Sequence, residues 1–356
     1  MYIASLATGH PPHHYNQEQL LEAIKKMWMN AHHNPRRVDQ LHKAVQVKER
    51  FLALPMEEYE QIENFTESND HFINVGTDVA EQVVSDALSK ANLTPQDVDA
   101  IFFVSVTGVA TPSIDAKLVN RLGFRSDIKR IPIFGLGCVA GAAGLARVHD
   151  YLKAYPKQVA LLVSVELCSL TLQPKDLSVA NLIASGLFGD GGSCVVGVGN
   201  LHEKASRSNQ KHHPSVLCSK SRFYSDTEDV MGWKIGADGF KVILKATVPQ
   251  LAEAHLRTDV DAFLAESGLN RSDITHWVCH TGGPKVLQAF ENSLELSEGT
   301  LHRSWDSLQS VGNLSSSSVL FVLKDTMENA TVNKGEYGLL LAMGPGFCCE
   351  MVLLQW

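Results

Sequence analysis

The chain has 356 residues, of which 44% are hydrophobic and 20% charged, and its formal net charge is −8. This composition predicts a globular protein of one large or two fused domains, and the negative charge argues against nucleic acid as its main partner. The sequence contains no run of about 18 apolar residues, so we expect no membrane-spanning helix. The first residues lack the basic and apolar regions of a signal peptide.

The first predicted element is an amphipathic helix over residues 17–31. Its apolar residues recur at helical spacing and would bury one face, namely Leu20, Leu21, Ile24 and Trp28. The helix lies outside the internal duplication described next, so we expect it to cap the core.

Two segments of the chain, 87–104 and 263–280, follow one plan. Each reads as a helix end, a turn with an acidic residue and an apolar strand. A constant offset of 176 positions pairs Leu88 with Leu264, Leu93 with Leu269, Asp97 with Asp273 and Val98 with Ile274. The shared order and offset indicate an internal duplication.

Cys138 lies where an apolar run that begins at Ile131 ends and a helix-like run of small residues begins at Val139. Unpaired N–H groups at a helix N-terminus favour an anion, so the thiolate, which is the nucleophilic form, would be stabilised there. The alternative is a buried core cysteine, since free cysteines are among the most buried residues.

The duplication extends to Cys138 itself. At an offset of 175 positions, Gly137-Cys138 corresponds to Gly312-Asn313, and in both copies a run of small residues opens a helix. Each copy then supplies two apolar strands, which are 158–165 and 192–198 in the first and 337–342 and 348–354 in the second. The polar run 202–214 reads as a linker or exposed loop. The sequence therefore predicts two layered α/β halves, 1–200 and 215–356, related by a pseudo-twofold axis.

Three residues converge if the two halves face one another: Cys138, Asn313 and His280, which ends a strand of the second half. A nucleophile, an imidazole and an amide donor form the arrangement expected for acyl transfer. His280 and Asn313 could both donate to a thioester oxygen that becomes an oxyanion or enolate, and a protonated His280 would lower the pKa of Cys138. Taken singly, His280 is explained as a structural histidine and Asn313 as an N-cap.

Other motifs indicate less. Gly135-x-Gly137 lacks the third glycine of a dinucleotide-binding fingerprint, and no residues have the spacing of metal ligands. The seven cysteines, an odd number without a CxxC pair, fit free thiols in a reducing compartment. We therefore expect a cytoplasmic protein.

Five motifs follow one another along the chain: Gly137-Cys-Val-Ala-Gly141, Leu187-Phe-Gly-Asp-Gly191, His280-Thr-Gly-Gly-Pro284, Gly312-Asn-Leu-Ser315 and Gly344-Pro-Gly346. In this order and spacing the sequence resembles the type III polyketide synthases, the chalcone-synthase-like family of the thiolase fold, over nearly the whole chain. The resemblance implies an α/β protein with a five-layered αβαβα core, assembled as a homodimer.

The resemblance also implies residue roles. Cys138 would be the acyl-carrying nucleophile, and His280 and Asn313 would promote decarboxylation of malonyl-CoA and steady the resulting enolate. Phe188 matches the family's aromatic gatekeeper beside the cysteine, and Phe240 is expected to be a second gatekeeper. No metal or bound organic cofactor is expected, because the coenzyme A thioesters supply the activation.

The remaining pocket positions implied by the resemblance are Val106, Thr111, Cys168, Thr171 and Ser315. Several depart from the plant pattern: Val106 replaces a threonine, and Thr111 replaces the methionine that plant subunits insert into their partner's pocket. These departures look bacterial, and similar bacterial enzymes accept fatty acyl-CoA and release alkylpyrones or alkylresorcinols. Arg37 and Lys43 are the candidate contacts for coenzyme A, beside the alternative of an exposed ion-pairing face.

The expected function is an iterative, decarboxylative condensation of malonyl-CoA onto an acyl-CoA starter held on Cys138, with closure to a pyrone or resorcinol. One rival is a single-round condensing enzyme of the ketoacyl synthase III type. Another is a non-catalytic partner subunit with the same fold, although such a subunit usually loses part of the Cys, His and Asn set.

Overall fold

A computed structural model describes residues 1–28, 34–203 and 213–356. The last residues of the predicted 17–31 helix and most of the predicted 202–214 linker lie outside these ranges. No helix in the described ranges is both long enough and apolar enough to cross a membrane.

The strands of the described chain are β1 (Tyr2–Gly9), β2 (His13–Asn16), β3 (Glu49–Leu52), β4 (Ala100–Val104), β5 (Lys129–Ile133), β6 (Val159–Leu167), β7 (Asp190–Val198), β8 (Ser215–Phe223), β9 (Met231–Gly236), β10 (Gly239–Leu244), β11 (Ile274–Cys279), β12 (Tyr337–Gly344) and β13 (Cys348–Gln355). Nine of them join in the order β11-β12-β13-β8-β1-β7-β6-β4-β5, while β9 pairs with β10 and β2 with β3.

The α-helices of the described chain are α1 (Gln17–Trp28), α2 (Pro35–Ala44), α3 (Phe65–Lys90), α4 (Ile114–Leu122), α5 (Ala140–Ala154), α6 (Val179–Leu187), α7 (Val248–Ala265), α8 (Pro284–Leu294), α9 (His302–Val311) and α10 (Ser318–Asn329). The short 3-10 turns used below are η2 (Pro95–Asp97), η3 (Gly137–Val139), η4 (Cys168–Thr171), η6 (Arg271–Asp273) and η7 (Ser315–Ser317).

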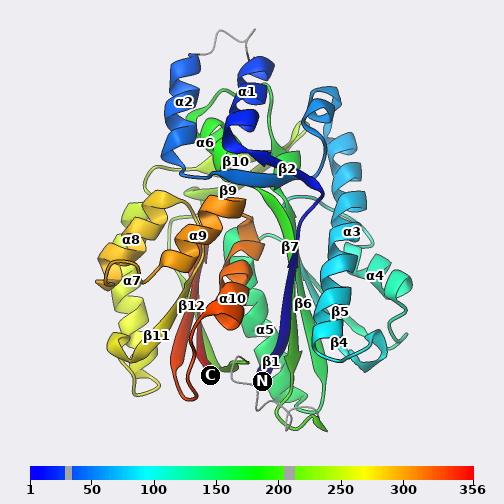
Figure 1. Cartoon of the computed structure of the whole chain (residues 1–356), viewed down its shortest axis with the longest axis vertical. Coiled ribbons are helices and arrows are strands. Elements are labelled where there is room, and N and C mark those ends of the chain that lie inside the picture. Colours follow the sequence, from blue (N-terminus) through cyan, green and yellow to red (C-terminus); the bar gives the residue numbers. More distant parts are fainter. Residues whose placement is uncertain (29–33, 204–212) are drawn as a thin grey trace.

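The molecule is built in five layers (Figure 1). Helices α5 and α10 lie between the two parts of the sheet, where Leu145 and Leu320 share one buried cluster with Val104 of β4 and Val352 of β13. Helix α3 packs on the outer face of β1, β6 and β7, and α7 and α8 pack on the outer face of the β11–β13 part. The predicted αβαβα arrangement is therefore confirmed.

The two halves repeat local structure as the sequence offset predicts. Asp97 Oδ2 accepts the Thr94 N–H at 2.7 Å in η2, and Asp273 Oδ2 accepts the Asn270 N–H at 2.8 Å in η6. Each turn has the geometry of a capping box and leads directly into a buried strand, β4 or β11. The paired aspartates therefore have the same role in both copies, which is to fix the turn between a helix (α3 or α7) and the following strand.

The N-terminal cap is formed by α1 and α2, which lie between the paired strands β2 and β3 in the chain (Figure 1). Leu20, Ile24 and Trp28 of α1 are buried, as predicted, and the Trp28 indole donates to the Pro174 carbonyl at 2.8 Å. Leu21 is only partly buried and packs against the edge of the same cluster, because it lies at the margin of the helix's apolar stripe. The cap is thus fixed to the first half of the molecule.

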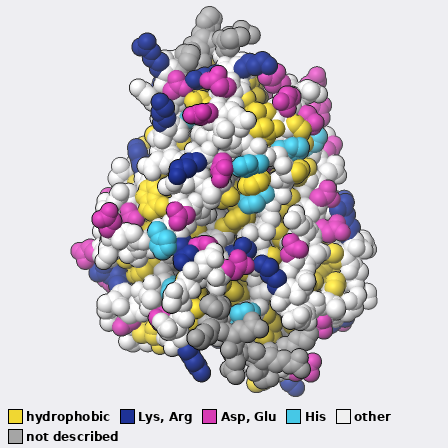
Figure 2. Space-filling view, in the orientation of Figure 1, with side chains coloured by type: hydrophobic (Ala, Val, Ile, Leu, Met, Phe, Trp, Pro, Cys, Tyr) yellow, Lys and Arg dark blue, Asp and Glu magenta, His cyan; other side chains and the backbone are white. Residues whose placement is uncertain are grey.

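Surface charge on the face shown in Figure 2 is mixed. Acidic and basic side chains are interspersed there, without a broad area of one sign. Such a face gives no electrostatic footprint for a long polyanion, in keeping with the acidic net charge.

Candidate active site

Cys138 lies in η3, between the end of β5 and the start of α5. The residue is 9% exposed and lines a cavity. Gly137 before it has a φ of +57°, a left-handed conformation that favours glycine, and a Cβ there would meet the Pro345 ring at 2.7 Å. The turn at Gly137 therefore lets the chain carry the Cys138 thiol into the cavity beside the β12–β13 connection.

The cavity brings the three predicted catalytic residues together. Cys138, His280 and Asn313 all line it, from η3, the end of β11 and the segment before η7. The His280 backbone N–H donates to the Leu341 carbonyl at 2.9 Å, which extends the β11–β12 pairing by one residue. Neither ring nitrogen of His280 has a hydrogen-bond partner among the described residues, so the imidazole is free to bind a reactant.

The orientation of the Asn313 amide is fixed by its neighbours. Asn313 Oδ1 accepts the Ser315 N–H at 2.8 Å and the Ser318 hydroxyl at 3.3 Å. Because both partners are donors, the oxygen is committed to them, and the Nδ2 group remains as the donor for the cavity. The Asn313 side chain thus accepts a backbone N–H at the start of η7, although the N-cap residues of η7 and α10 are Leu314 and Ser317, and it still presents an amide donor.

Burial favours the neutral forms of both titratable members of the site. Burial raises the pKa of the Cys138 thiol to about 12, with the Ser315 hydroxyl, 3.7 Å from the sulfur, acting in the opposite direction. Burial also lowers the pKa of His280 to about 4, so no imidazolium is present to stabilise a thiolate. A neutral imidazole can instead accept the thiol proton as the sulfur attacks.

A buried glutamate supports the cavity wall and was not singled out from the sequence. Glu166 on β6 accepts the Val106 N–H at 3.0 Å, the Thr107 hydroxyl at 2.8 Å and the Ser316 hydroxyl. Burial raises its pKa, and these donors act in the opposite direction. Glu166 thus joins Val106 of the first half to the serine turn η7 of the second half. The only signal for it was an acidic residue inside an otherwise apolar strand.

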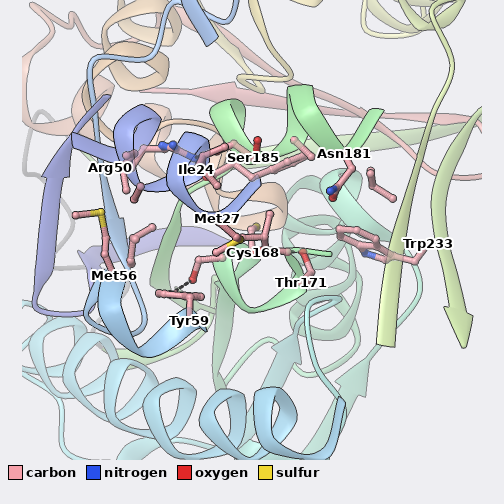
Figure 3. A pocket seen from close by; sticks show the side chains of 18 residues that line it. Ile24, Met27, Arg50, Met56, Tyr59, Cys168, Thr171, Asn181, Ser185 and Trp233 are labelled. Carbon is pink, nitrogen blue, oxygen red and sulfur yellow. Dashed lines mark hydrogen bonds between the residues drawn. The ribbon is translucent and has the colours of Figure 1, made fainter. Parts of the chain in front are cut away.

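A second cavity, whose lining is drawn in Figure 3, adjoins the first and shares lining residues with it. Its lining is largely apolar and includes the α1 side chains Leu20, Ile24 and Met27, together with the predicted pocket residues Cys168 and Thr171. Phe188, Trp233 and Val242 line both cavities and therefore form the partition between them. We refer to these three residues as the partition.

The structure distributes the predicted pocket residues between these spaces. Val106, Phe188 and Ser315 line the Cys138 cavity, and Cys168 and Thr171 line the second one. Thr111 is exposed and lines none of the cavities described here. The same is true of Arg37 and Lys43 on α2. The expected contact of Thr111 with a partner subunit therefore remains a prediction. The same holds for the expected contacts of Arg37 and Lys43 with coenzyme A.

Phe240, expected as a second gatekeeper, does not line the Cys138 cavity. This ring is buried, but it contacts Phe65, Phe134 and Trp233 and faces a separate hollow of about 1760 Å³. The reason is the register of the β9–β10 hairpin, in which Val242 pairs with Trp233 and Phe240 lies two pairs nearer the turn, opposite Ile235. Trp233 and Val242 take the place beside the Cys138 cavity.

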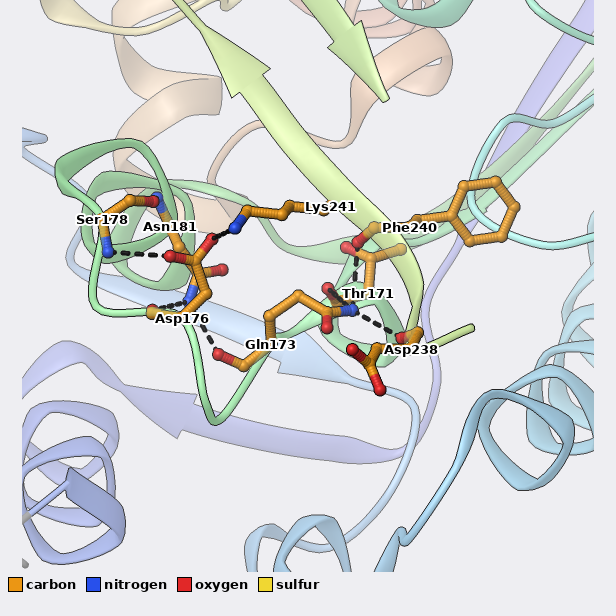
Figure 4. A network of polar contacts seen from close by, with 8 residues as sticks. All are labelled: Thr171, Gln173, Asp176, Ser178, Asn181, Asp238, Phe240 and Lys241. Atoms are coloured by element: carbon orange, nitrogen blue, oxygen red, sulfur yellow. Dashed lines mark hydrogen bonds and ion pairs between the residues drawn. The ribbon is translucent and has the colours of Figure 1, made fainter. Parts of the chain in front are cut away.

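The β9–β10 hairpin, which carries Trp233 and Val242, is fastened to the loop after η4 (Figure 4). Gln173 Nε2 donates to the carbonyls of Asp238 at 2.9 Å and Phe240 at 3.2 Å, and Lys241 pairs with Asp176 at 3.1 Å. These contacts set the position of the hairpin relative to η4. Sequence analysis missed Trp233 and Val242 because the register that pairs them depends on where the hairpin turns.

Comparisons with known proteins agree with this geometry. The models of the N-terminal and C-terminal domains of chalcone and stilbene synthases match residues 1–200 and 215–356. The chain is 48% identical to a 1,3,6,8-tetrahydroxynaphthalene synthase of Streptomyces peucetius subsp. caesius over 354 residues, which cover 99% of this chain and 93% of that protein. It is 31% identical to a 3,5-dihydroxyphenylacetyl-CoA synthase of Amycolatopsis orientalis over 315 residues, 87% of this chain and 83% of that protein.

Among solved structures, the chain is similar to the 1,3,6,8-tetrahydroxynaphthalene synthase of Streptomyces coelicolor A3(2), a bacterial type III polyketide synthase. The TM-score is 0.92 at 31% identity, and the match covers 100% of this chain and 99% of that one. Both family models, the duplicated five-layered core and the Cys138 cavity lead to the same assignment. The chain belongs to the chalcone and stilbene synthase family and is a type III polyketide synthase.

Proposed function

We propose that this enzyme extends an acyl starter on Cys138 by repeated decarboxylative condensation with malonyl-CoA. The observation that carries the proposal is that Cys138, His280 and Asn313 line one cavity, with the His280 ring nitrogens unpartnered among the described residues. In the first step the Cys138 sulfur attacks the acyl-CoA carbonyl carbon, its proton passes to His280, and coenzyme A leaves as the thiol.

Extension uses the same donors. Malonyl-CoA loses CO₂, and its electron pair remains as an enolate whose oxygen is held by Asn313 Nδ2 and the His280 ring. The enolate carbon attacks the Cys138 thioester, which forms a carbon–carbon bond and releases the sulfur. The extended chain then returns to Cys138 for another round. The thioesters supply the activation, so the proposal involves no metal or bound cofactor.

For the starter we propose a fatty acyl group, with a pyrone or resorcinol as product. Support comes from the second cavity, whose apolar lining by α1 and η4 suits an alkyl chain and adjoins the Cys138 cavity at the partition. A polyketide of a few units would remain near Cys138, while the alkyl tail would pass Phe188 and Trp233 into the second cavity.

A second candidate is a naphthalene product built from malonyl-CoA alone. It is favoured by the 48% identical relative, which is a 1,3,6,8-tetrahydroxynaphthalene synthase. In this case the partition would remain closed, and the second cavity would take no part in chain growth.

The two candidates are separated by their need for a starter. We would incubate the enzyme with malonyl-CoA alone and with malonyl-CoA plus acyl-CoAs of increasing chain length, and identify the products by mass spectrometry. The fatty acyl proposal predicts products whose mass rises with the starter. Products that are the same with and without every acyl-CoA would contradict it and support the naphthalene.

A variant of the partition sharpens the same assay. Trp233→Ala removes a wall shared by the two cavities, so it is expected to widen the range of accepted starters toward longer chains. Trp305→Phe, on α9 and away from both cavities, is the matched control and should keep the wild-type range. An unchanged range for Trp233→Ala would show that alkyl chains do not cross the partition.

A further inference from the structure

Arg50 is a buried cation that faces the second cavity from β3 (Figure 3). Its side chain is 3% exposed, and its Nη1 donates to the carbonyl oxygens of Ser185 at 2.9 Å and Phe188 at 2.6 Å. Its Nη2 donates to Gln17 Oε1 at 3.1 Å. A buried guanidinium is costly unless its donors are paired. Nε has no partner among the described residues, so the bonds of Nη1 and Nη2 are the ones that orient Arg50.

Arg50 and Gln17 together cap the C-terminus of α6. Gln17 Nε2 donates to the Gly186 carbonyl at 3.0 Å, which lies between the two carbonyls that Arg50 binds. The last carbonyls of a helix are unpaired and carry partial negative charge, so a cation stabilises them. Burial lowers the pKa of Arg50 to about 10, and Asp190 opposes this change, so the guanidinium stays charged at pH 7.

The segment that Arg50 holds also positions Asn313. The Asn313 N–H donates to the Leu187 carbonyl at 2.9 Å, and the Asn313 carbonyl accepts the Gly189 N–H at 3.0 Å. These two bonds bridge Phe188 and Asn313, so one short piece of backbone carries a partition residue and pairs with the amide donor of the active site.

The aliphatic part of Arg50 fits closely around this bridge. A Cβ at Gly312 would lie 2.7 Å from the Leu187 carbonyl and 3.1 Å from Arg50 Cδ, and one at Gly189 would lie 3.5 Å from Arg50 Cγ. Gly312 also has a φ of +74°. The space beside the bridge is thus occupied by the arginine stem, which leaves little freedom for Phe188 and Asn313 to shift.

We infer that Arg50 is a positioning residue that fixes both the Asn313 donor and the Phe188 wall of the partition. It touches neither the reacting atoms nor Cys138, and acts through the carbonyls of Ser185 and Phe188. This inference rests on the proposed function, because it assigns Asn313 to malonyl-CoA decarboxylation. It predicts that loss of Arg50 affects decarboxylation and product length more than acylation of Cys138.

The test compares two rates on the same preparation, so that a change in the folded fraction cancels. Malonyl-CoA decarboxylation is followed by CO₂ release, and acylation of Cys138 by intact-protein mass spectrometry. Arg50→Met should lower kcat for decarboxylation by about tenfold or more, with a smaller change in KM and in acylation. Arg50→Lys, which keeps the charge but not the two-pronged donor, should recover part of the loss.

Arg121→Met is the matched control, because Arg121 makes only exposed ion pairs with Asp78 and Glu81. It should keep both rates at wild-type values. If Arg50→Met does not fold, Gln17→Leu decides, because it removes one carbonyl contact to α6 and one partner of Arg50 at a partly exposed position. Gln17→Leu should shift the ratio of decarboxylation to acylation and the product lengths in the same direction as Arg50→Met, by a smaller factor.

An unchanged ratio of decarboxylation to acylation, with unchanged product lengths, in the folded variants would overturn the inference. A wild-type enzyme that is acylated on Cys138 but does not decarboxylate malonyl-CoA would overturn the proposed function, and this inference with it. The two failures are distinguishable because the first leaves the wild-type enzyme fully active.

Discussion

At the scale of single residues, the orientation of the catalytic groups is set by hydrogen bonds that point away from the cavity. Asn313 commits its oxygen to Ser315 and Ser318 and keeps its nitrogen for the cavity. Among the described residues, His280 makes hydrogen bonds only through its backbone, so its ring nitrogens are available as acceptor or donor. Cys138 is a neutral thiol with a pKa of about 12, and its reactivity must come from proton transfer during attack.

Replacing Asn313 by aspartate tests the donor directly. Asn313→Asp keeps an oxygen for Ser315 and Ser318 but exchanges the cavity-facing NH₂ for an oxygen that repels an enolate. We expect malonyl-CoA decarboxylation to fall by about 10²–10³-fold, while acylation of Cys138 persists. Asn120→Asp makes the same change at an exposed position on α4 and should leave both rates unaltered. Comparable decarboxylation in Asn313→Asp and wild type would rule out the assigned role.

The residue scale also shows where sequence reasoning succeeded and where it could not. Cys138 and Asn313 were predicted together because the duplication gives them equivalent helix starts. Phe240 was misplaced because the register of a hairpin depends on its turn, which the sequence does not specify. Glu166 and Arg50 were not predicted as parts of the site, because their bonds come from segments far apart in the chain.

At the scale of elements, the site lies where the first turns of α5 and α10 meet. Gly141 in the first turn of α5 packs directly on the Ser316 carbonyl oxygen, and an added Cβ would overlap that atom. This contact brings η3, with Cys138, against η7, which follows Asn313. The small residues that open a helix in both copies thus permit a close approach of the two helices. The pattern of small residues in the sequence does not by itself reveal this contact.

Substituting this glycine should move the two helix starts apart. Gly141→Ala is expected to lower the free energy of unfolding by about 1–3 kcal/mol through overpacking, and to slow extension more than acylation, because Cys138 and Asn313 lie on opposite sides of the contact. Gly236→Ala, at an exposed position where a Cβ meets nothing within 4 Å, is the control. Urea unfolding and product yield measure both effects. A stability equal to that of the control would contradict the close contact.

At the scale of the whole molecule, several buried histidines are kept neutral. Burial lowers the pKa of His42, which lies on α2 and packs against α6, to about 4, as it does for His280. Below the ordinary value of 6.5 the unfolded chain binds protons at these positions that the folded chain does not. The contribution of each of these histidines to the free energy of unfolding therefore has its full value above pH 6.5. It decreases as the pH drops toward 4.

His42 allows this dependence to be measured away from the reacting groups. Between pH 7.5 and pH 5, the wild-type enzyme should lose about 2 kcal/mol of unfolding free energy through His42 alone. His42→Gln should lack this part of the loss, and His302→Gln, at an exposed position, should keep it. Urea titrations at the two pH values supply the difference. An equal loss in His42→Gln and wild type would mean that His42 is not held neutral.

The overall architecture was accessible from sequence because it is repeated. Capping boxes, apolar strands and helix starts recur at a nearly constant offset, so two weak patterns supported each other. The partition between the cavities has no such counterpart in the other half, since it is built from α6 and the β9–β10 hairpin. Substrate range, which depends on that partition, was therefore the least predictable property.

The central claim is that Cys138 carries the growing chain. It is tested most directly by incubating wild type, Cys138→Ala and Cys218→Ala with acyl-CoA and mapping adducts by peptide mass spectrometry. Cys218 is a partly exposed free cysteine on β8, outside both cavities, and serves as the matched control. We predict one acyl adduct on the peptide containing Cys138 in wild type and Cys218→Ala, and none in Cys138→Ala. An adduct of equal yield in Cys138→Ala would contradict the account.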